Sequence, residues 1–418
     1  MNQYRAGVLS LSVFVGILAG WPLAHAKENE PLKKSEQPGR SVHQSALVVD
    51  MHCDTISRYM EGEDLSRDLP SGQIDIAKLK RASVGLEVFA AYVAVPRNDA
   101  DKNGAARRAF QQIDAIHRLI AENPKDLSLV LSPEEIAPFH RSRKTGILIA
   151  IEGGYAIQND LSLLRSFYRN GVRLMTLTHW NRTDWADASG DEKPELGGLT
   201  EFGVEVVKEM NRLGMIIDVS HAHDETFWDV LRISTKPVVA SHSCARALAG
   251  HFRNLTDDML KALAKNGGMV GINFAPAFLN SAWGKKQEEI QKELAAKYGI
   301  ADPNAGWDKV DAATRKRVLE EFNALMAQAE KSVGEVNIKT VADHIDHVVK
   351  VTGSTDHVGL GSDFDGIGAT PKGLENIACI PAITGELKAR GYKDPDIRKI
   401  LGGNFQRVFK AVAAGKAR

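Results

Sequence analysis

Eight short apolar runs, separated by amphipathic stretches, dominate the sequence. They cover residues 47–50, 85–92, 146–151, 172–177, 215–219, 237–240, 268–274 and 357–361. Such near-continuous apolar runs are typical of strands that are buried on both faces. The stretches between them have the spacing of amphipathic helices, as in residues 103–122, 160–170, 201–213, 224–231 and 256–266. Strands alternating with helices predict a parallel sheet, and eight such units predict a closed (β/α)8 barrel of the TIM type.

An open doubly wound sheet is the alternative, but no G-x-G-x-x-G follows the first run. The length of 418 residues would allow two or three domains, yet a barrel takes ~250 residues or more as one unit. We therefore expect a single domain over residues 44–418. The charged segment 280–335, between the seventh and eighth runs, breaks the period and predicts a helical insertion. A lid or subunit contact and a solvated helical pair without a role are both compatible with it.

The first residues look like an export signal. Arg5 precedes an apolar stretch from Ala6 to Trp21, and a small-x-small site ends at Ala26. This pattern predicts a cleavable signal peptide over residues 1–26, since the stretch is short of the ~20 apolar residues that a membrane span needs. The polar residues 27–43 predict a flexible leader. We expect a secreted protein, periplasmic in a Gram-negative bacterium, without a stable membrane anchor.

Charge and cysteine content exclude several classes of partner and scaffold. The chain has 53 Lys and Arg against 53 Asp and Glu, so nothing in its charge predicts binding to nucleic acid or an anionic membrane. Only three cysteines occur, Cys53, Cys244 and Cys379, and one must stay unpaired within the monomer. Disulfides are therefore expected to contribute little to stability.

Ionisable side chains stand where the predicted strands end. They are His52, Asp54, Glu152, His179, His221, His242 and Asp363. The carboxyl ends of the strands of such a barrel converge on one rim. Because ionisable groups gathered in a cleft cost several kcal/mol unless a cation or proton offsets them, the set predicts a metal site. A single histidine at a strand end would more often be a hydrogen-bonded structural residue.

The ligand types favour zinc, with manganese, cobalt or iron as substitutes. Five ligands exceed the three that a single catalytic zinc usually takes from protein, and Glu152 is a carboxylate suited to bridge two ions. Two Zn2+ ions would make a shared water available as hydroxide, aimed at a carbonyl or phosphoryl centre. No G-x-S-x-G or H-E-x-x-H motif competes with this reading.

Eight motifs in order resemble the membrane (renal) dipeptidase family of binuclear zinc peptidases, in the amidohydrolase superfamily. The resemblance runs from about Leu47 to Phe409. Its carriers are Asp50-Met51-His52-Cys53-Asp54, Ile151-Glu152-Gly153-Gly154, Leu177-Thr178-His179 with Trp185-Ala186-Asp187, Asp218-Val219-Ser220-His221, Ser241-His242-Ser243, Arg253-Asn254-Leu255-Thr256-Asp257-Asp258, Gly361-Ser362-Asp363-Phe364-Asp365-Gly366 and Gly402-Gly403-Asn404-Phe405.

The resemblance implies a role for each candidate. His52 and Asp54 would hold one zinc, His221 and His242 the other, and Glu152 together with a hydroxide would bridge them. His179 would contact the substrate carbonyl or the developing oxyanion. Arg253 would bind the free carboxylate of a dipeptide, and Asp363 would move the proton from the attacking water to the leaving amine.

Two of these assignments have rivals in the residues themselves. Without the resemblance, Arg253 reads as a surface arginine in a turn before a helix that Thr256 caps. Asp363 and Asp365 lie two apart and share a face, so Asp363 is preferred only because it is nearer the strand end. A calcium loop is the rival for this segment, but a third acid and a later glutamate are missing.

The resemblance implies a zinc-dependent dipeptidase in which metal-bound hydroxide attacks the peptide carbonyl of L-Xaa-L-Xaa and L-Xaa-D-Xaa dipeptides. Mixed L,D dipeptides from cell-wall turnover would be periplasmic substrates. The alternative is a binuclear amidohydrolase for another small amide, ester, lactam or N-acyl amino acid, because a metal site fixes the reaction better than the substrate. A homodimer stays open as the assembly.

Overall fold

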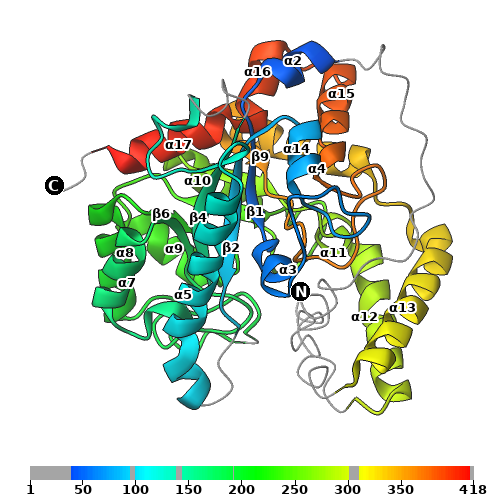
Figure 1. The fold of residues 1–418 in the computed structure, drawn as a ribbon, viewed down its shortest axis with the longest axis horizontal. Coiled ribbons are helices and arrows are strands. Elements are labelled where there is room, and N and C mark those ends of the chain that lie inside the picture. Colours follow the sequence, from blue (N-terminus) through cyan, green and yellow to red (C-terminus); the bar gives the residue numbers. More distant parts are fainter. Residues whose placement is uncertain (1–38, 95–98, 138–143, 192, 301–309, 415–418) are drawn as a thin grey trace.

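Eight parallel strands close into a barrel in the computed structural model, which describes residues 39–94, 99–137, 144–191, 193–300 and 310–414 (Figure 1). The strands are β1 (Val48–Cys53), β2 (Val84–Tyr92), β4 (Thr145–Glu152), β5 (Val172–Thr176), β6 (Ile216–Asp218), β7 (Val239–Ser243), β8 (Met269–Ile272) and β9 (Val358–Leu360). They pair in the order β2-β1-β9-β8-β7-β6-β5-β4, and β2 pairs directly with β4, which closes the ring. The predicted (β/α)8 barrel is confirmed, and the open sheet is excluded.

A ninth strand, β3 (Leu127–Leu129), was not predicted from the sequence pattern. It pairs in parallel with the start of β4, with Leu127 opposite Thr145, and lies outside the closed ring. Its three residues read Leu-Ser-Leu, which is too short a pattern to separate from a loop.

The predicted amphipathic stretches form the surrounding helices. They are α5 (Asp99–Glu122), α7 (Leu161–Arg169), α8 (Glu201–Leu213), α9 (Asp224–Ile233) and α10 (Asp257–Lys265). A further surrounding helix, α14 (Ile338–Thr352), was not among the predicted stretches. Side chains of the residues directly before several of these helices cap their amino ends. Asp160 accepts a backbone N–H of α7, Thr200 one of α8 and Thr256 one of α10. Gly214, with φ of 74°, ends α8 in the left-handed conformation that glycine adopts without strain.

Smaller elements complete the chain. They are α2 (Arg40–Ser45), α3 (Ile56–Met60), α4 (Ile76–Arg81), α11 (Pro276–Leu279), α15 (Pro381–Ala389), α16 (Asp394–Arg398), a π-helical turn (Lys399–Gly403), α17 (Asn404–Ala413) and the 3-10 turns η1 (Gly154–Ile157), η3 (Thr355–His357) and η4 (Ile377–Cys379). None of the helices among the described residues has the length and apolar character needed to cross a lipid bilayer.

The start of the domain lies earlier than predicted. The expected signal segment 1–26 and most of the expected leader 27–43 lie outside the described residues, but α2 begins at Arg40. His43 in α2 is buried, with Nε2 2.8 Å from the carbonyl oxygen of Ala82 and Nδ1 2.7 Å from the Thr384 hydroxyl. These contacts fasten α2 to α4 and α15, so the predicted leader boundary at residue 43 is wrong.

The barrel interior is apolar up to the rim at which the strands end. Inward side chains of the strands, among them Val49, Leu86 and Leu148, form one buried cluster with α17. Phe405 and Phe409 of α17 belong to this cluster and are fully buried. Gly402 lies against the carbonyl of Leu47, so α17 closes the end at which the strands begin.

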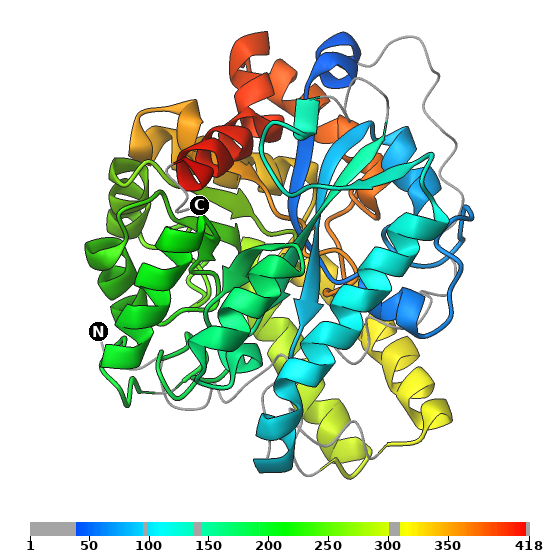
Figure 2. The ribbon, with the colours of Figure 1, turned by 60° about the vertical axis from the view of Figure 1, so that its left-hand side comes forward.

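The predicted insertion is a pair of helices between β8 and β9. Helices α12 (Ser281–Lys297) and α13 (Ala312–Val333) lie side by side at the lower right of Figure 1. Figure 2 shows them beyond the arrowhead of β2, on the side where the strands end. Ile290 and Leu294 of α12, with Val318 of α13, are buried. A helical insertion is confirmed, and its use as a lid or subunit contact stays a prediction.

Candidate metal centre

The ionisable side chains predicted at the strand ends meet at the carboxyl rim of the barrel. His52 lies in β1, Glu152 is the last residue of β4 and His242 lies in β7. The others occupy the loops that directly follow β1, β5, β6 and β9: Asp54, His179, His221 and Asp363. Their oxygen and nitrogen atoms form three overlapping groups, within each of which the atoms lie within 4.8 Å of one another.

Glu152 stands at the centre of the cluster. Its Oε1 lies 3.2 Å from His221 Nε2 and 3.3 Å from His242 Nε2. Its Oε2 lies 3.6 Å from His52 Nε2, which is itself 3.5 Å from Asp54 Oδ2. The two carboxylate oxygens therefore face different imidazoles, as in a carboxylate that bridges two positions.

Burial sets the protonation of this centre. Burial alone would raise the pKa of Glu152, but the surrounding imidazoles of His52, His179, His221 and His242 outweigh it and hold that pKa well below its usual range. Burial lowers the pKa of His242 to about 3 and that of His221 well below its usual value. Both imidazoles are therefore neutral at pH 7, which is the form that coordinates a metal ion.

The donor atoms fit a divalent cation. Neither ring nitrogen of the fully buried His52 has a hydrogen-bond partner among the described residues, and the same holds for Nδ1 of His221. Buried polar atoms in folded proteins are normally paired. Unpaired imidazole nitrogens beside carboxylate oxygens are the ligand set that zinc and related ions prefer.

A chain of hydrogen bonds behind the cluster fixes the tautomer of His242. The Ser241 hydroxyl donates its only proton to Asp218 Oδ2 at 2.6 Å and lies 2.7 Å from His242 Nδ1. Its oxygen must therefore accept the proton of His242 Nδ1. Nε2 of His242 consequently presents its lone pair to the cluster, as outer-shell partners of metal ligands generally arrange.

The structure gives Asp363 and Asp365 different surroundings, a distinction that their two-residue spacing in the sequence could not make. Asp365 is bound by Thr55 Oγ1 at 2.8 Å, the backbone N–H of Gln73 at 2.7 Å and Arg58 Nη1 at 3.1 Å. Asp363 instead faces the cluster, with Oδ1 3.9 Å from His52 Nε2. The preference for Asp363 as the residue near the reaction centre therefore agrees with its position.

Asp363 is also held by an amide whose orientation is fixed. Asn273 Oδ1 accepts the backbone N–H of Ala275 at 2.6 Å, which turns its Nδ2 toward Asp363 Oδ2 at 2.9 Å. Asp363 has φ of 63°, and His221 has φ of 67°. Such left-handed conformations are strained for residues with a Cβ and gather at functional sites.

Gly366 leaves room for two of the carboxylates. A Cβ atom at this position would lie 2.1 Å from Asp54 Oδ2 and 2.6 Å from Asp363 Oδ1. The backbone of the loop after β9 therefore touches the predicted metal ligand directly.

His179 and Arg253 flank the centre. His179 Nε2 lies 3.9 Å from Glu152 Oε1, and burial lowers the pKa of His179 to about 4. Arg253 is 3% exposed, so it is not the surface arginine that the residues alone favoured, although Thr256 does cap α10. Its Nη2 donates to the carbonyl of His242 at 3.2 Å, and no carboxylate of the described residues lies within ion-pair distance of it. Burial lowers the pKa of Arg253 to about 10, so it remains a buried cation.

Sequence reasoning missed two aromatic residues at this rim. Tyr92 is the last residue of β2, and its ring centroid lies 4.7 Å from that of His179. Trp180 follows His179 and contacts His221, with 5.1 Å between the ring centroids. Both stand at ends of predicted strands, so the rule that found the ionisable residues would have found them if extended to aromatic side chains.

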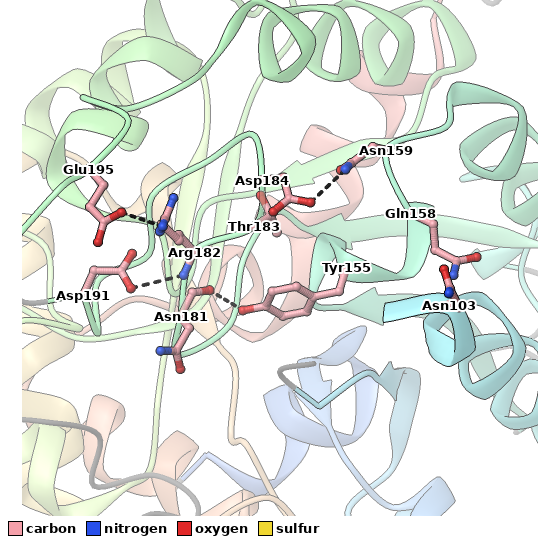
Figure 3. A pocket seen from close by; sticks show the side chains of 10 residues that line it. All are labelled: Asn103, Tyr155, Gln158, Asn159, Asn181, Arg182, Thr183, Asp184, Asp191 and Glu195. Atoms are coloured by element: carbon pink, nitrogen blue, oxygen red, sulfur yellow. Dashed lines mark hydrogen bonds and ion pairs between the residues drawn. The ribbon is translucent and has the colours of Figure 1, made fainter. Parts of the chain in front are cut away.

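A polar cavity of about 510 Å3 opens on the same rim, between η1 and the loop after β5 (Figure 3). Its charged groups all have partners within the protein. Arg182 pairs with Glu195 at 2.5 Å, and Asp184 accepts from Asn159 at 2.9 Å. The Tyr155 hydroxyl donates to the carbonyl of Asn181. This internal pairing contrasts with Arg253, which bonds the carbonyl of His242 but has no carboxylate of the described residues within ion-pair distance.

The cysteines take no part in the centre. All three are free thiols: Cys53 and Cys244 are buried and Cys379 is half-buried. Cys53 points into the core outside the barrel, away from the flanking ligands. The expected small contribution of disulfides agrees with these free thiols.

Known proteins resemble this chain in sequence and in fold. The model of the membrane dipeptidase family (peptidase family M19) matches residues 36–418. Dipeptidase 3 of Homo sapiens is 35% identical over 350 residues, which cover 83% of this chain and 60% of that protein. Dipeptidase 3 of Mus musculus is 34% identical, with 83% of this chain and 59% of that protein covered. The chain thus spans about three fifths of the length of these curated relatives.

Solved structures share the whole barrel. The probable dipeptidase PvdM from Pseudomonas aeruginosa superposes with a TM-score of 0.76 at 27% identity, covering 90% of this chain and 97% of that one. The metallopeptidase described as dipeptidase AC superposes with a TM-score of 0.70 at 25% identity, covering 88% and 99%. With its fold, its rim residues and its matched length, the chain belongs to the membrane dipeptidase family, peptidase family M19.

Proposed function

We propose that this chain is a metal-dependent dipeptidase that hydrolyses free dipeptides, L-Xaa-L-Xaa as well as L-Xaa-D-Xaa. The observation that carries the proposal is the buried Arg253 guanidinium, which lies beside the imidazole and carboxylate cluster and has no carboxylate of the described residues within ion-pair distance. A guanidinium binds a carboxylate through two parallel hydrogen bonds. A dipeptide anchored there by its free carboxylate has its scissile carbonyl one residue away, toward the cluster.

We further propose two zinc ions, with His52 and Asp54 as ligands of one, His221 and His242 as ligands of the other, and Glu152 between them. The two carboxylate oxygens of Glu152, which face different imidazoles, support this count. When bound, such ions supply Lewis acidity, which polarises the scissile carbonyl and makes water a stronger acid.

The remaining groups orient the substrate and move the proton. Arg253 fixes the carboxylate, and His179 meets the carbonyl oxygen as negative charge develops on it. Asp363, held by Asn273, takes the proton from the attacking water and gives it to the nitrogen of the leaving amino acid. The balance is one water consumed and two amino acids released.

Export to the periplasm is part of the proposal. The apolar stretch from Ala6 to Trp21 and the small residues before Lys27 support it. Sequencing the amino terminus of the mature protein tests the cleavage site, which we expect near Ala26. A mature protein that retains Met1 would contradict it.

The direct test is a substrate panel with the protein expressed from residue 27. Amine release is measured from L,L and L,D dipeptides and from their N-acetylated and C-amidated forms, with and without a chelator. We expect cleavage of the free dipeptides only, lost with the chelator and restored by Zn2+. Equal cleavage of carboxylate-free amides would favour the wider amidohydrolase activity.

The variant Arg253→Ala tests whether the guanidinium binds the free carboxylate of the dipeptide. We expect a loss of about 100-fold or more in kcat/KM for free dipeptides, because a buried charge-assisted pair is removed. Arg246→Ala is the matched control, since Arg246 follows the same strand but already pairs with Asp224 at 2.7 Å. A small and equal loss in both variants would contradict the role of Arg253.

A further inference from the structure

The indole of Trp180 lies between the two anchoring points of the site. Its ring centroid is 5.1 Å from that of His221 and 5.8 Å from that of His179, at the cluster. On the other side, the guanidinium carbon of Arg253 lies 5.9 Å from the centre of the Trp180 ring. Trp180 is only partly buried, so part of this residue is accessible to solvent.

This position has a consequence that rests on the proposed function. A dipeptide whose carbonyl reaches the cluster and whose carboxylate reaches Arg253 has a single Cα atom between the two. That Cα and its side chain belong to the carboxyl-terminal residue. They must lie beside the indole, because Trp180 borders both anchors.

The surface around Trp180 is apolar. The ring of Phe252 lies 6.0 Å from the indole and that of Phe278 lies 6.5 Å from it. Phe278 is also 5.5 Å below the Arg253 guanidinium. His251 packs between the two phenyl rings, at 4.4 Å from Phe252 and 4.5 Å from Phe278. Burial lowers the pKa of His251 to about 3, so this imidazole adds no charge at neutral pH.

The loop after β5 holds the backbone of Trp180 in place. A Cβ on Gly190 would lie 2.0 Å from the carbonyl oxygen of Trp180, so the loop returns directly against the Trp180 backbone. Asp191 fixes that return by accepting the backbone N–H of Ala188 at 2.9 Å and of Arg182 at 3.2 Å. Trp180 is therefore a preorganised surface, which reduces the entropy lost on binding.

We propose that Trp180, with Phe252 and Phe278, selects dipeptides whose carboxyl-terminal residue has an apolar side chain. Such a side chain buries apolar area against three aromatic rings. A lysine side chain in the same place brings its cation toward the buried Arg253. An aspartate side chain competes with the terminal carboxylate for Arg253 and faces the carboxylates of Glu152 and Asp363.

The test compares kcat and KM for Ala-Leu, Ala-Gly, Ala-Asp and Ala-Lys. We expect the wild-type protein to favour Ala-Leu, mainly through KM. In Trp180→Ala the ratio of kcat/KM for Ala-Leu over Ala-Gly should fall about tenfold, the usual size of a side-chain contact in an apolar pocket. Trp180→Phe should recover most of that ratio because it restores an aromatic face.

Trp228→Ala is the matched control, because Trp228 is 38% exposed on α9 and lies outside the site. It should leave the ratio unchanged. Equal cleavage of Ala-Leu and Ala-Gly by the wild-type protein would overturn the proposed selection for an apolar carboxyl-terminal residue but would leave the dipeptidase function standing. An unchanged ratio in Trp180→Ala overturns it as well, as does an equal fall of kcat for all four substrates. Wild-type protein that cleaves no dipeptide overturns the proposed function itself.

Discussion

The two ends of the barrel bury different chemistry with the same strands. Where the strands begin, α17 places Phe405, Phe409 and other apolar side chains against the interior. Where they end, the buried groups are imidazoles, carboxylates and the Arg253 guanidinium. The first end gains free energy from every side chain that it buries, whereas the second buries charge that a ligand must compensate. One end of the barrel therefore stabilises the fold, and the other end carries the proposed metal and substrate site.

Positive φ at residues other than glycine is concentrated at the second end, although Ser83, directly before β2, also has φ of 52°. His221, Asp363 and Asp365, all at the carboxyl rim, have positive φ although none is glycine. Strained residues persist only where the surrounding structure holds them, as Thr55 and Arg58 hold Asp365. The strained residues at the rim thus keep their conformations because the surrounding structure of the barrel holds them.

The largest effect should follow from Glu152→Gln, which keeps the shape of the central side chain and removes its charge. We expect loss of both metal ions and activity below about 1% of wild type, because the carboxylate that faces three imidazoles is gone. Metal content by mass spectrometry and amine release measure it. Glu205→Gln, on the exposed side of α8, is the control. Full metal content in Glu152→Gln would refute its bridging position.

The next largest effect should follow from Asp363→Asn. We expect kcat to fall by about 100-fold to 10,000-fold with the metal content unchanged, because proton transfer is lost while the other ligands remain. Asp365→Asn provides the comparison, since that residue pairs with Arg58 and faces away from the cluster. It should lower the free energy of unfolding more than kcat. Wild-type kcat in Asp363→Asn would remove Asp363 from the mechanism.

Phe405→Ala probes the other end of the barrel. We expect about 3–5 kcal/mol less free energy of unfolding, because a fully buried ring leaves a cavity in the barrel interior. Urea denaturation measures the change, and kinetics on the folded protein should show kcat and KM near wild type. A large change in KM at unchanged stability would show that the two ends are not independent.

The smallest effect concerns His344 of α14, which accepts the backbone N–H of Ala245 at 3.1 Å and lies 3.1 Å from the carbonyl of Leu279. Burial lowers the pKa of His344 from 6.5 to about 4. The unfolded chain therefore binds more protons between these values, so stability falls as the pH drops below about 6.5.

Denaturation at about pH 8 and about pH 5 should show a loss of stability in wild type to which other buried histidines also contribute, and this loss should be about 1–2 kcal/mol smaller in His344→Gln. His117→Gln, an exposed histidine on α5, is the control. An identical pH dependence in His344→Gln would exclude this residue as the cause.

Periodicity was enough to predict the barrel, because each strand is buried on both faces and carries its own apolar run. Strand ends were enough to predict His52, Glu152 and His242, since parallel strands deliver their last residues to one rim. The strand β3 and the helix α2 were missed because three and six residues carry too little pattern. Trp180 was missed because the strand-end rule was applied to ionisable side chains alone. Asn273 was missed for another reason, since its importance depends on Asp363, which is distant in sequence.

Gly366 shows how a position without a side chain can be as constrained as a ligand. Any other residue would place its first carbon against Asp54 and Asp363. In a saturation mutagenesis screen for activity, Gly366 should therefore tolerate as few substitutions as His52 does, although it has no functional group. The cause would be steric, so its variants would retain every ligand and still fail to arrange them.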